Sequence, residues 1–309
     1  MQDHDIIVIG GGIAGMSAAL TAARLGRDTL ILTGGVPGGE LLNIERIEGI
    51  PGHEEGIAGY DLCPITQELA DAAGAHFVTE QATSVAAEGD KWKVIAGGDT
   101  FIARVVILAM GAHVTKLGVP GEAEFAGRGV SHCATCDGPL LRGKVAVVAG
   151  GGDSGMQEAL TLASHVAKVF IVERSDGLTG QVPYVEQVNA NPKIELLTGR
   201  EISAIEGADK VEKVRLKDVS SGDESAIEAQ GVFAFTGLEP TVELVTDLVE
   251  RDARGLVKVD AALRTSARGI FAAGNLRSGN SWRAAGAMGD GATAATSAAR
   301  YCADGDWTT

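Results

Sequence analysis

Short apolar runs and amphipathic stretches alternate along this chain in the order expected for parallel strands joined by helices. The run DIIVIG at 5–10 predicts a strand, SAALTAARLG at 17–26 predicts a helix that ends at Gly26, and DTLILT at 28–33 predicts the next strand. Together they predict a βαβ unit that opens at residue 5. The chain is therefore expected to be an α/β protein.

Three glycines stand at the turn between that first strand and helix. Gly10, Gly12 and Gly15 have the G-x-G-x-x-G spacing of dinucleotide-binding turns. The first glycine permits the tight turn, the second lets a pyrophosphate approach the backbone, and the third lets helix and strand pack closely. The start of the helix would then face the phosphates, so this turn predicts a dinucleotide site.

The same arrangement recurs later in the chain. KVAVVA at 144–149 predicts a strand, MQEALTLASHV at 156–166 a helix, and KVFIVE at 168–173 another strand. The glycine spacing is repeated by Gly150, Gly152 and Gly155. Two units of this kind imply two nucleotide sites, commonly one for a flavin and one for a nicotinamide cofactor.

Two further strand-and-turn segments have the character of crossings between domains. They are VVILAMGAHVTKLGVPG at 105–121 and GVFAFTGLEPT at 231–241. The stretch that begins with GIFAAG predicts a strand, a loop and a helix of small residues that return to the first domain. We therefore expect a Rossmann-like domain formed by 1–114 and 241–309, with a second Rossmann-like domain at 115–240 inserted in it.

The net charge and the lengths of the apolar runs argue against a nucleic-acid-binding protein and against a membrane protein. The 309-residue chain has a formal net charge of −15, which argues against nucleic-acid binding because that requires clustered lysine and arginine. No apolar run reaches the length of a membrane span, and the N-terminal MQDHDIIVIGGG is acidic and enters a strand directly, unlike a secretory signal. We therefore expect a cytoplasmic protein that binds neither nucleic acid nor membrane. Cys63 and Cys302 are isolated in sequence and are expected to be packing residues.

The other two cysteines, Cys133 and Cys136, form a Cys-x-x-Cys pair in HCATCDGPL. A zinc site normally needs four ligands, and no second Cys-x-x-Cys or histidine pair has suitable spacing, so no metal is expected. A structural disulfide across so short a loop would add little stability. A reversible dithiol–disulfide is favoured, and the carboxyl group of Asp137 could pass a proton to a departing thiolate.

In order and spacing, GGGIAG, CATCDG, GKVAVVAGGGDSG and GIFAAG resemble the low-molecular-weight thioredoxin reductase family over essentially the whole chain. The resemblance implies FAD in the first domain, a nicotinamide cofactor in the inserted domain, and a homodimer. It implies that Cys136 faces the flavin, that Cys133 attacks the disulfide of a thioredoxin-like protein or small molecule, and that Asp137 donates the proton. By position, the implied flavin contacts outside the first glycine motif are Gly39, Glu40, Gly274, Asn275, Arg283 and Ala284.

The nicotinamide site departs from the NADPH-using members, which carry a His-Arg-Arg run and a further arginine. The corresponding residues here are Glu173, Arg174, Ser175 and Thr179. Arginine and lysine bind the 2′-phosphate of NADPH by charge-assisted hydrogen bonds. An acidic residue at the strand end instead accepts hydrogen bonds from the ribose hydroxyls of NADH and repels that phosphate. We therefore expect Glu173 and Arg174 to bind nucleotide, with NADH preferred over NADPH. This stretch, with CDGPL, also resembles the flavoprotein subunit of alkyl hydroperoxide reductase.

The flavin side departs from the family as well. Asn275 stands where the family has Asp, Arg283-Ala284 where it has Arg-Gln, and Glu40 where it has Gln. A carboxylate at Glu40 would disfavour the negatively charged reduced flavin. Because the phosphate loop is complete, FAD binding is still expected, with an altered flavin potential or an unusual electron partner.

The leading interpretation is an FAD-dependent disulfide oxidoreductase that moves electrons from NAD(P)H through FAD and the Cys133–Cys136 disulfide to an external disulfide. Two other enzymes fit the same residues. One oxidises a small-molecule dithiol and passes the electrons to oxygen, and the other takes electrons from ferredoxin with no nicotinamide bound. A flavin-binding regulator is the remaining alternative, but such a module has no need of the cysteine pair and Asp137.

Overall fold

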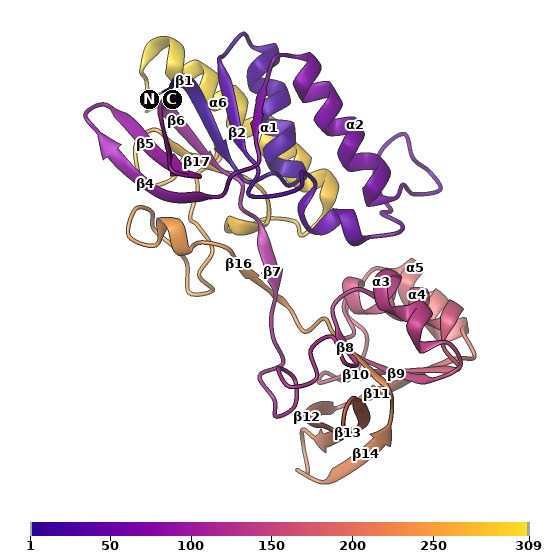
Figure 1. Ribbon diagram of the computed structural model, residues 1–309. Coiled ribbons are helices and arrows are strands. Elements are labelled where there is room, and N and C mark those ends of the chain that lie inside the picture. Colours follow the sequence, from indigo (N-terminus) through magenta and orange to yellow (C-terminus); the bar gives the residue numbers. More distant parts are fainter. Residues whose placement is uncertain (1, 308–309) are drawn as a thin grey trace. The chain divides into compact units, whose positions relative to one another are not determined.

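The computed structural model describes residues 2–307, and the chain divides into two compact units (Figure 1). Unit 1 comprises Met1–His113 and Glu239–Thr309, and unit 2 comprises Val114–Leu238. The second unit is thus inserted in the first, as the sequence predicts. The two passages of the chain between the units run through β7 (Ala112–Val114) and β16 (Leu238–Pro240), which pair with each other.

Unit 1 is built on a seven-stranded sheet in the order β3-β2-β1-β6-β5-β4, with β17 paired to β6. Around β1 the sheet is parallel, since β1 runs parallel to both β2 and β6, and β17 also runs parallel to β6. The β4–β5 hairpin continues the sheet in the antiparallel sense. The strands are β1 (Gln2–Ile9), β2 (Thr29–Leu32), β3 (His76–Val78), β4 (Ala82–Glu88), β5 (Lys91–Ala96), β6 (Asp99–Leu108) and β17 (Ile270–Ala272).

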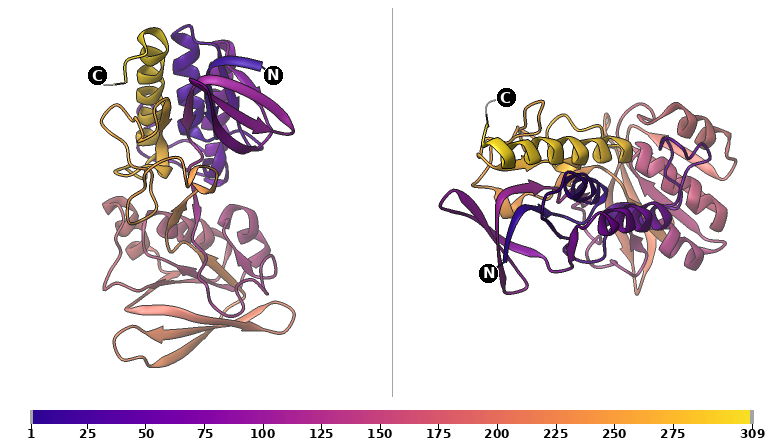
Figure 2. Two further views of the ribbon diagram at one scale, coloured as in Figure 1. Left: turned by 90° about the vertical axis from the view of Figure 1, so that its left-hand side faces the viewer. Right: turned by 90° about the horizontal axis from the view of Figure 1, so that it is seen from above.

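Alternate residues of β1 show why this sheet is buried on both faces. Ile6 and Val8 pack among apolar residues of three helices, which cover one face in Figures 1 and 2. Ile7 and Ile9 point to the opposite face, where the β4–β5 hairpin and residues 242–257 cover them. Because both faces are covered, these strands read as continuous apolar runs in the sequence. The three helices are α1 (Ile13–Arg24), α2 (Gly59–Ala72) and α6 (Ala284–Asp304).

Unit 2 repeats the parallel arrangement on a smaller scale. Its sheet has the order β11-β10-β9-β15-β8, with helices on one face and a three-stranded antiparallel sheet, β12-β13-β14, packed on the other. The parallel strands are β8 (Val130–Ser131), β9 (Val145–Ala149), β10 (Lys168–Glu173), β11 (Ile194–Thr198) and β15 (Gly231–Ala234). The helices are α3 (Ala134–Asp137), α4 (Asp153–His165) and α5 (Val182–Ala190), and the antiparallel strands are β12 (Arg200–Gly207), β13 (Val211–Asp218) and β14 (Glu224–Glu228).

Both helices that follow glycine motifs begin earlier than the sequence predicts. α1 starts at Ile13 instead of residue 17, and α4 starts at Asp153 instead of residue 156. The reason is that the third glycine of each motif lies inside the first helical turn. Within residues 2–307, no helix combines the length and apolar character needed to cross a membrane.

Candidate active site

The first glycine motif connects β1 to α1, and its three glycines meet different surroundings. Gly10 has a φ of +114°, and a Cβ there would lie 2.3 Å from the carbonyl oxygen of Ala109. A Cβ at Gly15 would lie 1.9 Å from the carbonyl oxygen of Gly10. A Cβ at Gly12, by contrast, would have no atom within 4 Å. The outer glycines are therefore required by the fold, whereas Gly12 leaves open space at the helix start.

The start of α1 has the features of a phosphate site. Gly12 is the N-cap residue, no side chain caps the helix, and its first turn contains no acidic residue. The first amide groups of the helix therefore have no side-chain acceptor, and they carry the positive end of the helix dipole. This arrangement, with the open space at Gly12, fits the pyrophosphate of the expected FAD.

Substitution of these glycines separates ligand binding from folding. Gly12→Ala is expected to fold normally and to bind FAD at least tenfold more weakly, a loss of about 1.4 kcal/mol or more, because the methyl group would fill the open space. Gly15→Ala should instead destabilise the flavin-free chain, because its methyl group would overlap the Gly10 carbonyl. FAD titration and thermal denaturation of the flavin-free proteins measure the two effects. Unchanged FAD affinity in Gly12→Ala would place the pyrophosphate elsewhere.

Two other predicted flavin residues lie beside this loop. The N–H of Gly38 donates to the carbonyl of Gly11 at 2.7 Å, and a short 3₁₀ helix, η1 (Gly39–Asn43), follows. Gly39 has a φ of +59°, and a Cβ there would lie 3.3 Å from the Cα of Gly12. Glu40 is exposed on η1. The fold thus brings Gly39 to the glycine loop, and Glu40 is the next residue in the chain.

The turn after β17 approaches the same helix start. Gly274 has a φ of +78°, and a Cβ there would lie 2.8 Å from the Cβ of Ala14 in α1. Asn275 follows in the 3₁₀ helix η4 (Gly274–Leu276) and is half-buried. Among residues 2–307, no group forms a hydrogen bond with its carboxamide, which leaves the donor and acceptor of that side chain available to a ligand.

The remaining flavin candidates lie where α6 begins. Arg283 is the exposed N-cap residue of α6, its Nη1 donates to the carbonyl of Trp282 at 3.3 Å, and Ala284 is the first helical residue. Trp282 has a positive φ of 53°, an unusual backbone conformation for a large side chain. Its N–H donates to the Asn280 carboxamide at 2.9 Å, and Asn280 donates to the carbonyl oxygens of Arg277 and Asn275 at 2.8 and 3.3 Å. These hydrogen bonds of Asn280 therefore stabilise the loop between η4 and α6.

The second glycine motif, between β9 and α4, repeats the geometry of the first. Gly150 has a φ of +107°, and a Cβ there would lie 2.2 Å from the carbonyl oxygen of Phe235, while one at Gly155 would lie 1.9 Å from the Gly150 carbonyl. A Cβ at Gly152 would meet only Thr179 Oγ1, at 4.0 Å. Gly152 is also the N-cap residue of α4 without a side-chain cap, but unlike α1 this helix has an acidic residue, Asp153, in its first turn. The loop therefore fits the pyrophosphate of a nicotinamide nucleotide.

Glu173, at the end of β10, points back to this second loop. Its Oε2 accepts the Gly151 N–H at 2.6 Å, and its Oε1 accepts the N–H and hydroxyl of Ser175, each at 2.8 Å. Burial raises the pKa of Glu173, but the hydrogen bonds from Ser175 and Gly151 outweigh it and hold the pKa below its ordinary value. Arg174 is exposed, and its Nε lies 3.3 Å from Oε2 of Glu201. The loop thus faces a carboxylate, with one arginine nearby in sequence.

Cys133 and Cys136 form a disulfide with a Cα–Cα distance of 5.3 Å. Cys133 is the N-cap residue of α3, and its Sγ accepts the N–H of Cys136 at 3.1 Å. Cys136 is exposed, whereas Cys133 and Asp137 are half-buried. Asp137 is the last residue of α3, directly after Cys136 in the chain. Within the described residues, no group of three or more His, Cys, Asp or Glu is arranged to hold a metal ion.

Sequence reasoning missed two carboxylates near these predicted sites, one buried and one half-buried. Glu158 on α4 is 9% exposed, and its Oε2 accepts the N–H of Ala134 beside Cys133 at 2.7 Å. Asp290 on α6 accepts hydrogen bonds from Gly274 and Arg277. The sequence offers only a weak signal for either, an acidic residue within an otherwise apolar helical stretch. Their partners lie 13 to 24 residues away along the chain, beyond the reach of a local pattern.

The two other cysteines are buried, which raises the pKa of each thiol to about 11. At about pH 8, we therefore expect a thiol reagent to find no fast-reacting group in the oxidised native protein, since the thiolate is the reactive species. Reduction of the Cys133–Cys136 disulfide should yield two fast thiols, and unfolding under reducing conditions should yield all four cysteines. Fast labelling of Cys63 or Cys302 in the native protein, located by peptide mapping, would contradict this expectation.

Comparison with known proteins agrees with this arrangement along nearly the whole chain. A family model described as pyridine nucleotide-disulphide oxidoreductase matches residues 4–291. The thioredoxin reductase of Treponema pallidum is 39% identical over 299 residues (97% of both chains), and that of Mycolicibacterium smegmatis is 42% identical over 304 residues (98% of both). The crystal structure of a Lactococcus lactis thioredoxin reductase matches with a TM-score of 0.95 at 37% identity, covering 97% of this chain and 99% of that one.

These matches include both glycine loops and the cysteine pair. The predicted fold class is confirmed: two Rossmann-like domains, one inserted in the other. The family implies FAD and a nicotinamide nucleotide as cofactors. This chain therefore belongs to the pyridine nucleotide-disulphide oxidoreductase family and is an FAD-dependent disulfide oxidoreductase of the thioredoxin reductase type.

Proposed function

We propose that this enzyme reduces the disulfide of a thioredoxin-like protein with electrons from NADH. The observation that carries the proposal is the Cys133–Cys136 disulfide, which is held in a one-turn helix with Cys136 exposed. A short disulfide at the solvent boundary is suited to exchange with an external disulfide, because thiol–disulfide exchange requires access to sulfur. Cys133 is half-buried and Cys136 exposed; we assign the attack on the external disulfide to Cys133 because the resemblance to thioredoxin reductases implies it.

We assign the two cofactors to different parts of the chain. Residues 1–114 and 241–309 hold FAD, and residues 115–240 hold the nicotinamide nucleotide; the open spaces at Gly12 and Gly152 support this assignment. The proposed FAD contacts are Gly10, Gly12, Gly15, Gly39, Glu40, Gly274, Asn275, Arg283 and Ala284. The proposed contacts of the nicotinamide nucleotide are Gly150, Gly152, Gly155, Glu173 and Arg174.

Bound FAD supplies the two-electron link between a reduced nicotinamide and a disulfide. Two electrons break the Cys133–Cys136 bond and leave two sulfur atoms in the thiol state. The Cys133 thiolate then attacks the outer disulfide, forms a mixed disulfide and expels one partner thiolate, which takes a proton from Asp137. Attack by the Cys136 thiolate on Cys133 Sγ re-forms the internal disulfide and releases the second partner sulfur.

The preference for NADH rests on the position of Glu173. Its carboxylate lies at the Gly151 N–H, beside the space expected for the adenosine ribose. An ionised carboxylate accepts hydrogen bonds from ribose hydroxyls and repels a 2′-phosphate. A single exposed Arg174, already paired with Glu201, does not form the cluster of cations that a 2′-phosphate requires.

The similar proteins indicate the protein partner, and the chemistry of disulfide reduction indicates the cellular location. The similar proteins are thioredoxin reductases, which favours a thioredoxin-like protein over a small-molecule disulfide as the acceptor. We further propose a homodimer. A disulfide reductase works where thiols are kept reduced, which favours the cytoplasm.

Anaerobic stopped-flow spectroscopy tests this function. The purified, FAD-loaded protein is mixed with NADH and, separately, with NADPH, and the flavin absorbance is followed. We expect fast bleaching by NADH and slow bleaching by NADPH, and then turnover when oxidised thioredoxin is added. Turnover with small-molecule disulfides alone would replace the proposed partner. If neither nucleotide bleaches the flavin, the nicotinamide assignment fails, and reduced ferredoxin and dithiols with oxygen become the donors to test.

A further inference from the structure

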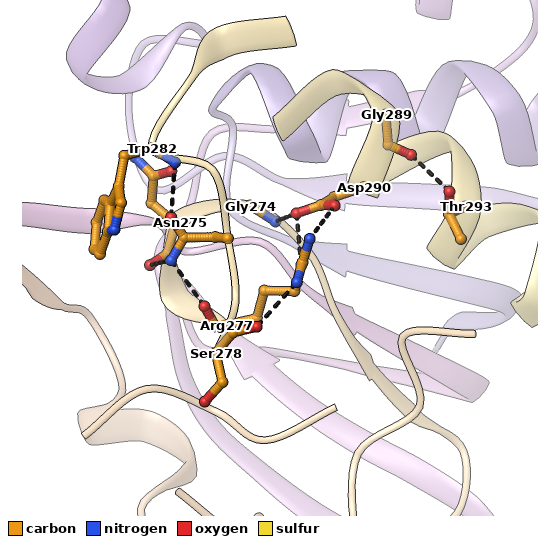
Figure 3. Close-up of polar contacts among 9 residues, drawn as sticks. Gly274, Asn275, Arg277, Ser278, Trp282, Gly289, Asp290 and Thr293 are labelled. Carbon is orange, nitrogen blue, oxygen red and sulfur yellow. Dashed lines mark hydrogen bonds and ion pairs between the residues drawn. The ribbon is translucent and has the colours of Figure 1, made fainter. Parts of the chain in front are cut away.

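We infer that the ion pair between Arg277 and Asp290 positions the Gly274–Asn275 turn for FAD and sets the charge beside it. Arg277 lies in the loop after β17, and Asp290 lies within the first two turns of α6 (Figure 3). Neither residue has been included among the proposed FAD contacts. The inference rests on the proposed FAD site and assigns these two side chains a role as positioning residues.

The Asp290 carboxylate accepts three hydrogen bonds, two of them from a charged donor. Its Oδ2 accepts the Nε of Arg277 at 2.7 Å and the N–H of Gly274 at 3.0 Å, and its Oδ1 accepts the Nη2 of Arg277 at 2.6 Å. The side chains of Arg277 and Asp290 are only 17% and 13% exposed. A bidentate contact of this kind fixes direction as well as distance, so it holds the η4 backbone to α6 in a single geometry.

The turn that this pair holds lies against the predicted pyrophosphate helix. A Cβ at Gly274 would lie 2.8 Å from Ala14 and 3.9 Å from Ala287, so Gly274 is enclosed between α1 and α6. α6 itself approaches α1 closely, since a Cβ at Gly291 would lie 2.2 Å from the carbonyl oxygen of Ala14. The next residue, Asn275, has a half-buried carboxamide with no partner among residues 2–307. The ion pair therefore fixes the backbone that carries an available hydrogen-bonding side chain.

The pair also places two compensating charges at this turn. Reduction of a flavin adds negative charge, so a nearby uncompensated cation favours the reduced form and an uncompensated anion disfavours it. In the native protein the two charges largely cancel. Removing only one of them should shift the flavin midpoint potential in a direction that depends on which charge is left. A shift caused by damaged packing would not depend on the sign of the removed charge.

The test compares Asp290→Asn, Arg277→Gln and the double variant with the wild-type holoenzyme. FAD affinity is measured by titrating the flavin-free chain, and the midpoint potential by equilibration with redox dyes. Each single variant should bind FAD about tenfold more weakly or worse, because a half-buried charged partner is left unpaired. Asp290→Asn should raise the potential, Arg277→Gln should lower it, and the double variant should return close to the wild-type potential.

Asp260→Asn is a matched control in the same unit. Asp260 also accepts an arginine Nε, that of Arg264 at 2.7 Å, and two backbone N–H groups, but none of these hydrogen bonds involves the turn at Gly274. It should change neither FAD affinity nor potential. Arg277→Lys, which keeps the cation, covers the case in which a neutral variant fails to fold; it should weaken FAD binding while leaving the potential near the wild-type value.

The possible results separate this inference from the proposed function. If wild-type protein binds FAD but the single variants match Asp260→Asn, or if both shift the potential in the same direction, the positioning role is wrong and the FAD site stands. If the wild-type chain takes up no FAD, the proposed FAD site is wrong, and so is the inference that rests on it.

Discussion

The Cys133→Ser and Cys136→Ser variants are each expected to lose disulfide-reducing turnover by a factor of about 10³ or more, because one sulfur atom cannot complete the exchange. Flavin bleaching by NADH should persist in both, since neither cysteine is assigned to nucleotide binding. The two variants should also differ. In Cys136→Ser the free Cys133 can still attack oxidised thioredoxin, and without Cys136 the mixed disulfide has no internal thiolate to resolve it.

A covalent complex on non-reducing gels, identified by mass, is therefore expected for Cys136→Ser and not for Cys133→Ser. Cys63→Ser and Cys302→Ser are the controls, because both thiols are buried and free of the disulfide, and turnover should be near the wild-type value. A trapped complex in Cys133→Ser instead would exchange the roles of the two cysteines. Full turnover in either disulfide variant would remove the pair from the mechanism.

The second large effect concerns nucleotide choice. Glu173→Gln is expected to shift the ratio of kcat/KM for NADPH over NADH upward by about tenfold or more, because the substitution removes a charge that repels the 2′-phosphate. The glutamine keeps one acceptor for the Gly151 N–H, so the glycine loop should retain its shape. Flavin bleaching with each nucleotide, followed over a range of concentrations, measures the change.

The pH dependence of this preference provides an independent check. Hydrogen bonds hold the pKa of Glu173 below its ordinary value despite burial, so the carboxylate remains charged throughout the neutral range. The wild-type preference for NADH should therefore persist unchanged from about pH 7 to about pH 9. Glu195→Gln is the control: this exposed residue of unit 2 pairs with Lys168 and should leave nucleotide choice unchanged. An unaltered ratio in Glu173→Gln would show that other groups select the nucleotide.

The sequence by itself determined the features that depend on neighbours along the chain. A buried strand, a glycine turn and a helix follow one another within a few residues, so both dinucleotide units could be predicted from spacing alone. The Cys-x-x-Cys pair is equally local, and the structure contains the disulfide. The bounds of α1 and α4 were less accurate, because apolar periodicity alone does not show that a helix already includes the last glycine of its motif.

Only the tertiary structure decided how distant segments complete each site. β17 returns beside β6 and carries Gly274 to the start of α1, and α6 then supplies Asp290 to the same turn. Glu158, on α4, likewise accepts the backbone N–H of Ala134, the residue after Cys133. These contacts arise from packing of strands and helices that are remote in sequence. The sequence around a lone acidic residue in an apolar helix does not show which group it pairs with. No local pattern could therefore reveal the charges at the Gly274–Asn275 turn and beside the disulfide.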